Sequence, residues 1–168
     1  MSATAFLFPG QGAQFPGMGK SVVDQCPAAL QLFDQAREIL GYDLAEVCWG
    51  SDSDKLSSTA YSQPALYVCS LAAVELLRTA SPDVVSGCST AAGLSLGEYT
   101  ALTFAGVTSF EDGLRVVKVR GEAMQAAAVA RESGMVSALM LTPEQVAEVV
   151  QRASATGPIW IEIGRAHV

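Results

Sequence analysis

The pentapeptide Gly93-Leu94-Ser95-Leu96-Gly97 constrains the fold of this 168-residue chain more than any other segment. It has the pattern G-x-S-x-G, in which glycines leave room for a sharp turn between a strand and a helix. The small residues of Cys88–Gly93 predict the strand, and Ser95–Ala105 predicts the helix, closed by Gly106. A strand that turns directly into a helix is typical of an α/β sheet.

Other segments extend this α/β pattern. The apolar run Ala5–Phe8 predicts a buried strand, which stops at Pro9-Gly10 and leads into a glycine-rich loop over Gly10–Gly19. Strands and helices alternate, so we expect the sheet to be parallel in its first part. A helix is predicted over Ala28–Leu40, capped by Gly41, and Gly50–Thr59 is expected to be a polar connection. An amphipathic helix is predicted over Ser62–Arg78, with Pro64 in its first turn. A further helix is predicted over Thr108–Val129, opened by a capping box of Thr108 and Glu111.

The last fifth of the chain predicts a second, smaller unit. Met135–Leu141 is expected to be a strand, Thr142–Gln145 the capped start of a helix, and Ile159–Ile161 another strand. This order is β-α-β.

Composition excludes several classes of function. The chain is 50% hydrophobic and 16% charged, as globular proteins are, and its net charge of -7 argues against a nucleic-acid partner. No membrane span is expected, because Glu75 and Arg78 interrupt the apolar run Ala65–Ala80. The four cysteines form no C-x-x-C pair, so we expect no metal site. The sequence shows no signal-peptide pattern, so the expected location is the cytoplasm.

Two glycine-rich turns could carry chemistry. Ser95 is a candidate nucleophile, because a helix N-terminus and the free backbone N–H of Leu96 can stabilise an oxyanion beside it. The alternative is an ordinary Gly-Ser turn that caps a helix. The loop that starts at Gly10 could bind phosphate, but a dinucleotide fingerprint fails there, because its third glycine would fall on Phe15.

Four motifs, in order and spacing, resemble the malonyl-CoA:acyl carrier protein transacylases of fatty-acid synthesis and the related acyltransferase domains of polyketide synthases. They are Phe8-Pro9-Gly10-Gln11-Gly12-Ala13-Gln14, Ser62-Gln63-Pro64-Ala65-Leu66, Gly93-Leu94-Ser95-Leu96-Gly97-Glu98-Tyr99 and Val119-Arg120-Gly121-Glu122-Ala123-Met124-Gln125. The resemblance implies an α/β-hydrolase-like parallel-sheet core, incomplete in this chain, with the start of an inserted ferredoxin-like subdomain. It places the core in residues 1–131 and the start of the subdomain in residues 132–162.

The resemblance also implies a ping-pong mechanism centred on Ser95. This serine would take the malonyl group from coenzyme A as an ester and yield it to the phosphopantetheine thiol of acyl carrier protein. The backbone N–H groups of Gln11 and Leu96 would form the oxyanion hole. Two loops would thus meet at one acyl oxygen, which explains a glycine-rich loop that binds no phosphate.

By the same resemblance, Arg120 would bind the free carboxylate of the malonyl group, and Gln63 and Met124 would line the pocket. A guanidinium suits this role because its planar fork donates two parallel hydrogen bonds to one carboxylate. The alternatives are a surface arginine on a helix that also carries Arg115 and Lys118, a capping glutamine and a core methionine. Glu98 and Tyr99, in the first turn after Ser95, are interpreted as structural.

The family needs no metal or redox cofactor, and malonyl-CoA and acyl carrier protein are its substrates. A full-length member is expected to be a monomer. Two alternatives stay open: an acyltransferase of polyketide type, and a serine esterase, which shares G-x-S-x-G but needs no Arg120.

The chain departs from the family pattern in two ways. Leu94 stands where the family has a histidine before the nucleophile, and the usual catalytic base is another histidine in the second half of the family's sequence. The only histidine here is His167. Residues 163–168 can be back-translated into the start of a sequencing adapter, so we expect a non-native tail on a truncated, inactive fragment.

Overall fold

The computed structural model describes residues 4–130, 134, 136 and 138–161. The chain divides into two compact units, Met1–Glu132 and Ser133–Val168, and each is described by itself below. None of the helices in the described ranges combines the length and the apolar character that a membrane span requires.

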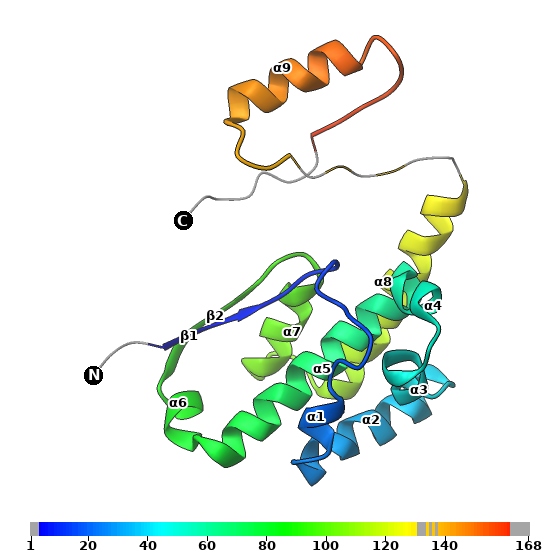
Figure 1. Cartoon of the computed structure of the whole chain (residues 1–168). Coiled ribbons are helices and arrows are strands. Elements are labelled where there is room, and N and C mark those ends of the chain that lie inside the picture. Colours follow the sequence, from blue (N-terminus) through cyan, green and yellow to red (C-terminus); the bar gives the residue numbers. More distant parts are fainter. Residues whose placement is uncertain (1–3, 131–133, 135, 137, 162–168) are drawn as a thin grey trace. The chain divides into compact units, whose positions relative to one another are not determined.

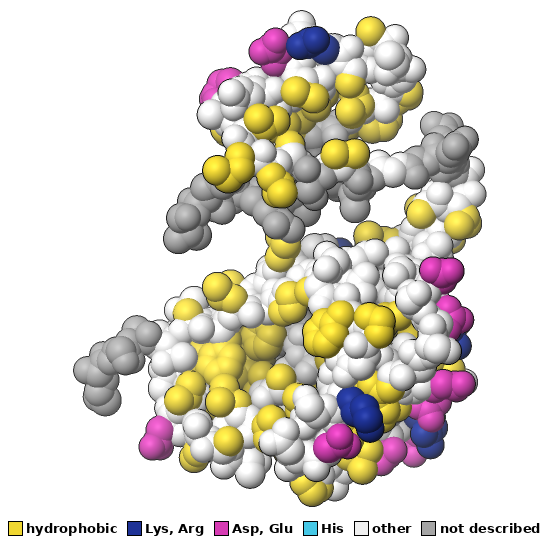
Figure 2. Space-filling model, viewed as in Figure 1, with side chains coloured by type: hydrophobic (Ala, Val, Ile, Leu, Met, Phe, Trp, Pro, Cys, Tyr) yellow, Lys and Arg dark blue, Asp and Glu magenta, His cyan; other side chains and the backbone are white. Residues whose placement is uncertain are grey.

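The first unit contains a parallel pair of strands, as predicted. Strand β1 (Thr4–Phe8) lies beside β2 (Cys88–Gly93), with Phe8 opposite Gly93 at their carboxyl ends (Figure 1). Only one face of β1 is covered: Phe8 is buried, whereas Leu7 is 78% exposed. The prediction of a fully buried strand is therefore wrong, because among the described residues only one layer of helices packs on the sheet. Apolar side chains consequently reach the surface near the strands (Figure 2).

Eight helices are described in the first unit, and four of them correspond to predicted helices. These four are α2 (Pro27–Leu40), α5 (Thr59–Ala80), α7 (Leu96–Phe104) and α8 (Phe110–Ala130), and the starts of α5 and α8 differ from the prediction. Gly41 and Gly106 end α2 and α7 with φ of 81° and 76°, in the left-handed region that favours glycine. The short helices that were not predicted are α1 (Lys20–Val23), α3 (Leu44–Trp49), α4 (Ser53–Ser57) and α6 (Pro82–Ser86).

Helix α4 lies inside the segment predicted to be a polar connection. The Asp52 carboxylate accepts a hydrogen bond from the Lys55 N–H at 2.9 Å, which caps the helix. Leu56 is buried, and it fixes the helix against the core. A run of polar residues with one apolar anchor thus forms a helix where only a connection was expected.

Helix α5 begins three residues earlier than predicted. Pro64 lies within the helix rather than in its first turn. Every residue from Ser62 to Val68 is buried, so this half of the helix is a central helix and not an amphipathic one. Its first N–H group, that of Thr59, is bonded by Gln125 from α8, a distant partner that no local pattern reveals.

Helix α8 is capped by Ser109, and the predicted capping box of Thr108 and Glu111 is wrong. The Ser109 hydroxyl accepts a hydrogen bond from the Asp112 N–H at 3.0 Å. The Thr108 hydroxyl is instead paired with that of Thr103, 2.8 Å away. The tertiary partner on α7 thus outcompetes the local cap.

Tyr67 joins α5 to α7 and α8 at the centre of the unit. Its side chain is fully buried, and its hydroxyl lies 2.8 Å from Thr103 Oγ1 and donates to the Phe110 carbonyl at 3.1 Å. Burial raises the pKa of Tyr67 to about 12. Gly113 makes room for this hydroxyl, because a Cβ there would lie 2.2 Å from the Tyr67 oxygen.

The second unit contains α9 (Pro143–Ala153), with the predicted capping box between Thr142 and Gln145. Ile159–Ile161 is not a strand, because no described segment of this unit pairs with it. The described residues of the predicted strand Met135–Leu141 are also irregular, while Met135 and Ser137 lie outside the described residues. Among the described residues, the helix is therefore the part of the predicted β-α-β order that is present.

The contact between Gly113 and Tyr67 yields a stability prediction. We expect Gly113→Ala to destabilise the chain by about 2–3 kcal/mol in urea unfolding followed by circular dichroism, since the added methyl overlaps a fixed hydroxyl. Tyr67→Phe should recover at least about 1 kcal/mol of that cost in the double variant. Gly157→Ala, whose Cβ would meet open space, is the control. Additive losses in the double variant would show that the overlap is not the cause.

Candidate functional site

Three glycines let the loops after β1 and β2 meet at the carboxyl ends of the strands. A Cβ on Gly97 would lie 2.2 Å from the Phe8 carbonyl oxygen, and one on Gly93 would lie 1.9 Å from the Gly97 carbonyl carbon. A Cβ on Gly10 would lie 2.6 Å from the Leu94 carbonyl oxygen. Side chains at these positions would push the two loops apart, so the glycines of both motifs serve one backbone contact.

Ser95 occupies the turn between β2 and α7 with a strained backbone. It is the N-cap of α7, with φ of 53° and ψ of -105°, although it is not a glycine. Such a conformation costs free energy and persists only where the surroundings enforce it. The half-buried Ser95 side chain therefore stands at a helix N-terminus in the place that the sequence predicts.

Arg120 extends from α8 to Ser95. Its Nη2 donates a hydrogen bond to Ser95 Oγ at 2.8 Å, and its Nη1 donates to Gln63 Oε1 at 2.6 Å. Its guanidinium carbon lies 5.5 Å from the centre of the Tyr99 ring. No carboxylate in the described part of the chain is within ion-pair distance of Arg120, whereas Arg115 on the same helix pairs with Asp112 at 2.8 Å. Arg120 is thus a cation that contacts neutral groups beside a serine.

Gln63 and Met124 complete the group. Gln63 is fully buried on α5, and its Nε2 donates to the Met124 sulfur at 3.2 Å. Both polar atoms of its amide are therefore bonded: Oε1 accepts from Arg120, and Nε2 donates to Met124. The structure brings together all four of the side chains singled out in the sequence: Ser95, Gln63, Arg120 and Met124.

The backbone N–H groups of Gln11 and Leu96 are the predicted donors of the oxyanion hole. Neither N–H donates to another group in the described part of the chain, so both are free to meet an oxygen. The contact between Gly10 and Leu94 brings the loop of Gln11 to the loop of Ser95. The Gln11 side chain points elsewhere and donates to Thr59 Oγ1 at 3.2 Å.

Sequence reasoning missed the contact of Tyr99 with Arg120. Tyr99 was interpreted as structural, but it stands four residues after Ser95 on α7, which places both near one face of the helix. An aromatic ring over a guanidinium is a favourable cation–π arrangement. The helical spacing from the serine is the signal that could have indicated it.

No general base stands beside Ser95 among the described residues. His167 lies outside them, as does the rest of the predicted tail at 163–168. Leu94, which replaces the family's histidine, uses its N–H to bond the Phe8 carbonyl at 3.2 Å. Residues 4–130 and the described residues that follow contain no group of His, Cys, Asp and Glu side chains that could hold a metal ion.

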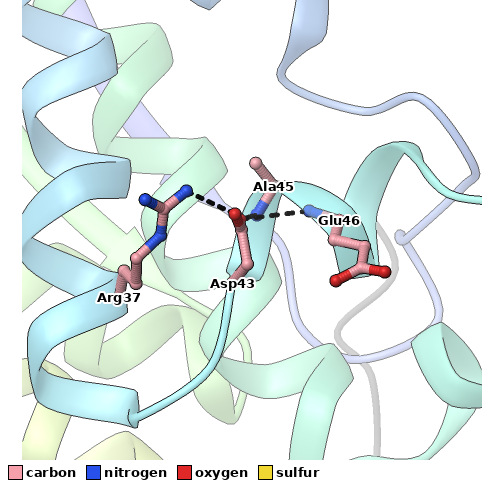
Figure 3. Close-up of polar contacts among 4 residues, drawn as sticks. All are labelled: Arg37, Asp43, Ala45 and Glu46. Carbon is pink, nitrogen blue, oxygen red and sulfur yellow. Dashed lines mark hydrogen bonds and ion pairs between the residues drawn. The ribbon is translucent and has the colours of Figure 1, made fainter.

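A separate hollow of about 460 Å³ lies between α2 and α3, away from Ser95. Asp43 pairs with Arg37 and accepts hydrogen bonds from the N–H groups of Ala45 and Glu46 at 2.9 and 3.3 Å (Figure 3). These contacts cap α3 and tie it to α2. They give Arg37 and Asp43, which line this hollow, a structural role.

Comparisons with known proteins find a matching family, similar sequences and similar structures. The family described as "Acyl transferase domain" matches residues 5–158. The mitochondrial malonyl-CoA-acyl carrier protein transacylase of Mus musculus is 48% identical over 136 residues, which are 81% of this chain and 35% of the mouse protein. The malonyl CoA-acyl carrier protein transacylase of Bacillus subtilis is 42% identical over 159 residues, 94% of this chain and 48% of that protein.

A solved structure, described as MCAT from Streptococcus pneumoniae, has a TM-score of 0.78 and 42% identity, covering 92% of this chain and 49% of that one. The α/β fold with a small parallel sheet is therefore shared with such proteins. This chain spans about half or less of the length of the relatives it matches.

The strained backbone of Ser95 yields a second prediction. We expect Ser95→Gly to be more stable than Ser95→Ala by about 1 kcal/mol, because glycine adopts a positive φ freely. Urea unfolding of the two variants measures this difference, and both lose the same hydroxyl bond to Arg120. Equal stabilities would contradict the strain at this position.

Proposed function

The chain belongs to the acyl transferase domain family, and we propose that it carries the nucleophile and the carboxylate-binding residues for malonyl transfer from malonyl-CoA to acyl carrier protein. The observation that carries this proposal is the hydrogen bond between Arg120 Nη2 and Ser95 Oγ. This bond holds Arg120, which has no ionic partner in the described part of the chain, beside a serine at a helix N-terminus. The names of the relatives, which combine malonyl-CoA with acyl carrier protein, support the choice of substrates.

In the first half-reaction, Ser95 Oγ attacks the thioester carbonyl of malonyl-CoA. An O–C bond forms, the C–S bond breaks, and the serine proton ends on the thiol of coenzyme A. The phosphopantetheine thiol of acyl carrier protein then attacks the ester, and Ser95 regains a proton. The free N–H groups of Gln11 and Leu96 stabilise the oxyanion in both steps.

Arg120 selects acyl groups that end in a carboxylate. Its Nη2 leaves Ser95 and donates to the malonyl carboxylate, while Gln63 holds Nη1. An acetyl group would leave the cation unpaired, at a cost of roughly 2–5 kcal/mol. This selectivity argues against the serine esterase alternative, which gives Arg120 no role.

The finer description of the fold belongs to the same proposal. The turn at Ser95 serves as a nucleophile elbow in an α/β-hydrolase-like core over residues 1–131, and residues 132–162 begin a ferredoxin-like subdomain. The strain at Ser95 and the parallel pair of β1 and β2 support the first part.

Metal and redox cofactors have no step in this chemistry. We place the protein in the cytoplasm, as a monomer at full length, while fatty-acid and polyketide pathways share the chemistry.

The general base of this mechanism is not found among the described residues. A serine needs a base within hydrogen-bond reach, and among the described residues no histidine offers one. We therefore expect the 168-residue chain to acylate slowly and not to turn over.

The first half-reaction, in which Ser95 is acylated once, can test the proposal even if no general base assists it. The chain is incubated with malonyl-CoA or acetyl-CoA in excess, and the acyl ester on the Ser95 peptide is quantified by mass spectrometry. We expect malonyl label to exceed acetyl label by about 100-fold, and Arg120→Ala to abolish most of that preference. The ratio does not depend on the base, because both reactions lack it equally.

Arg115→Ala, on the same helix but paired with Asp112, should keep the preference. Equal labelling by the two donors, label that persists in Ser95→Ala, or no Ser95 label at all would overturn the proposal.

A further inference from the structure

Gln125 caps the start of α5 from another helix. Its Oε1 accepts hydrogen bonds from the Ser58 hydroxyl at 3.0 Å and from the Thr59 N–H at 2.9 Å. Ser58, the N-cap of α5, uses its own side chain for no cap. The close approach of the helices is built into α8, because a Cβ on Gly121 would lie 2.9 Å from the Thr59 carbonyl oxygen.

Thr59 extends this contact to the loop after β1. Its Oγ1 accepts a hydrogen bond from Gln11 Nε2 at 3.2 Å. A continuous path thus runs from Gln125 on α8, through the first residue of α5, to Gln11. The path leaves the Gln11 N–H free for another partner.

We propose that Thr59 and Gln125 are positioning residues for the Gln11 N–H, an inference that rests on the proposed function. The loop of Gln11 is exposed, and Gly12 beside it has φ of +103°, so few contacts fix the orientation of this peptide group. Gly10 holds the loop against Leu94 on one side, and Thr59 ties it on the other.

This assignment gives α8 two roles at one site. Arg120 on α8 faces the carboxylate end of the acyl group, and Gln125, on the same helix, reaches the loop of the oxyanion hole through Thr59. The two ends of a malonyl group are a fixed distance apart. One rigid helix therefore sets the spacing between the cation and the N–H donor.

Substitutions at Thr59 separate the loop tie from the helix cap. Thr59→Val keeps the shape and the N–H bonded to Gln125, and removes only the hydroxyl that Gln11 contacts. Thr59→Ser keeps that hydroxyl. Thr79→Val, at the exposed far end of α5, is the matched control, because the Thr79 hydroxyl donates to the Glu75 carbonyl of its own helix.

The readouts are the limiting rate of Ser95 malonylation, the malonyl-CoA concentration that gives half this rate, and hydrogen exchange of the amides of residues 10–14. We expect Thr59→Val to lower the limiting rate about fivefold to tenfold, with the half-saturating concentration unchanged, and to speed exchange in the loop. Thr59→Ser should restore both to within about twofold, and Thr79→Val should change neither.

Different results would overturn the positioning role of Thr59 and the proposed function. An unchanged rate in Thr59→Val, a change in the half-saturating concentration alone, or a Thr59→Ser variant as slow as Thr59→Val would overturn the positioning role. If the unmodified chain gains no label, the proposed function fails. In that case hydrogen exchange alone tests whether Thr59 anchors the loop. Equal exchange rates in residues 10–14 of Thr59→Val and of the unmodified chain would overturn the anchoring as well.

Discussion

The structure depends on the contact between two stretches of backbone where the parallel strands end. Gly93 and Gly97 let the turn after β2 fold onto the end of β1, and Gly10 lets the loop after β1 reach back to Leu94. Any side chain at these positions would overlap backbone atoms that cannot move aside. The same packing enforces the strained conformation of Ser95, so sheet geometry and the presentation of the serine hydroxyl have one cause.

The second contribution comes from the packing of α5 against α8. Helix α5 is buried on all sides near Gln63, so this amide must find partners inside the protein. It finds them in Arg120 and Met124, and through Arg120 it reaches the hydroxyl of Ser95. A buried polar group thus orients a cation beside the serine hydroxyl at the N-terminus of α7.

Much of this arrangement could be predicted from the sequence, because the signals are local. The parallel pair, the turn at Ser95 and the ends of α2 and α7 follow from apolar runs and from glycines at positive φ. The start of α5 and the irregular course of Ile159–Ile161 do not, because the first depends on a distant partner and the second on the lack of one among the described residues. The cap of α8 does not either, because Thr108 pairs with Thr103 and leaves the cap to Ser109. The nearness of Ser95 and Arg120 came from family resemblance, since 25 residues of sequence separation say nothing about a hydrogen bond.

The central claim is that Ser95 and Arg120 hold the two ends of one malonyl group. A crystal structure of the chain after reaction with malonyl-CoA tests it most directly. The account predicts an ester bond at Ser95 Oγ, with both carboxylate oxygens at hydrogen-bond distance from the Arg120 guanidinium and the ester carbonyl oxygen facing the N–H groups of Gln11 and Leu96. A malonyl group whose carboxylate points into solvent, with Arg120 turned away from it, would contradict the account.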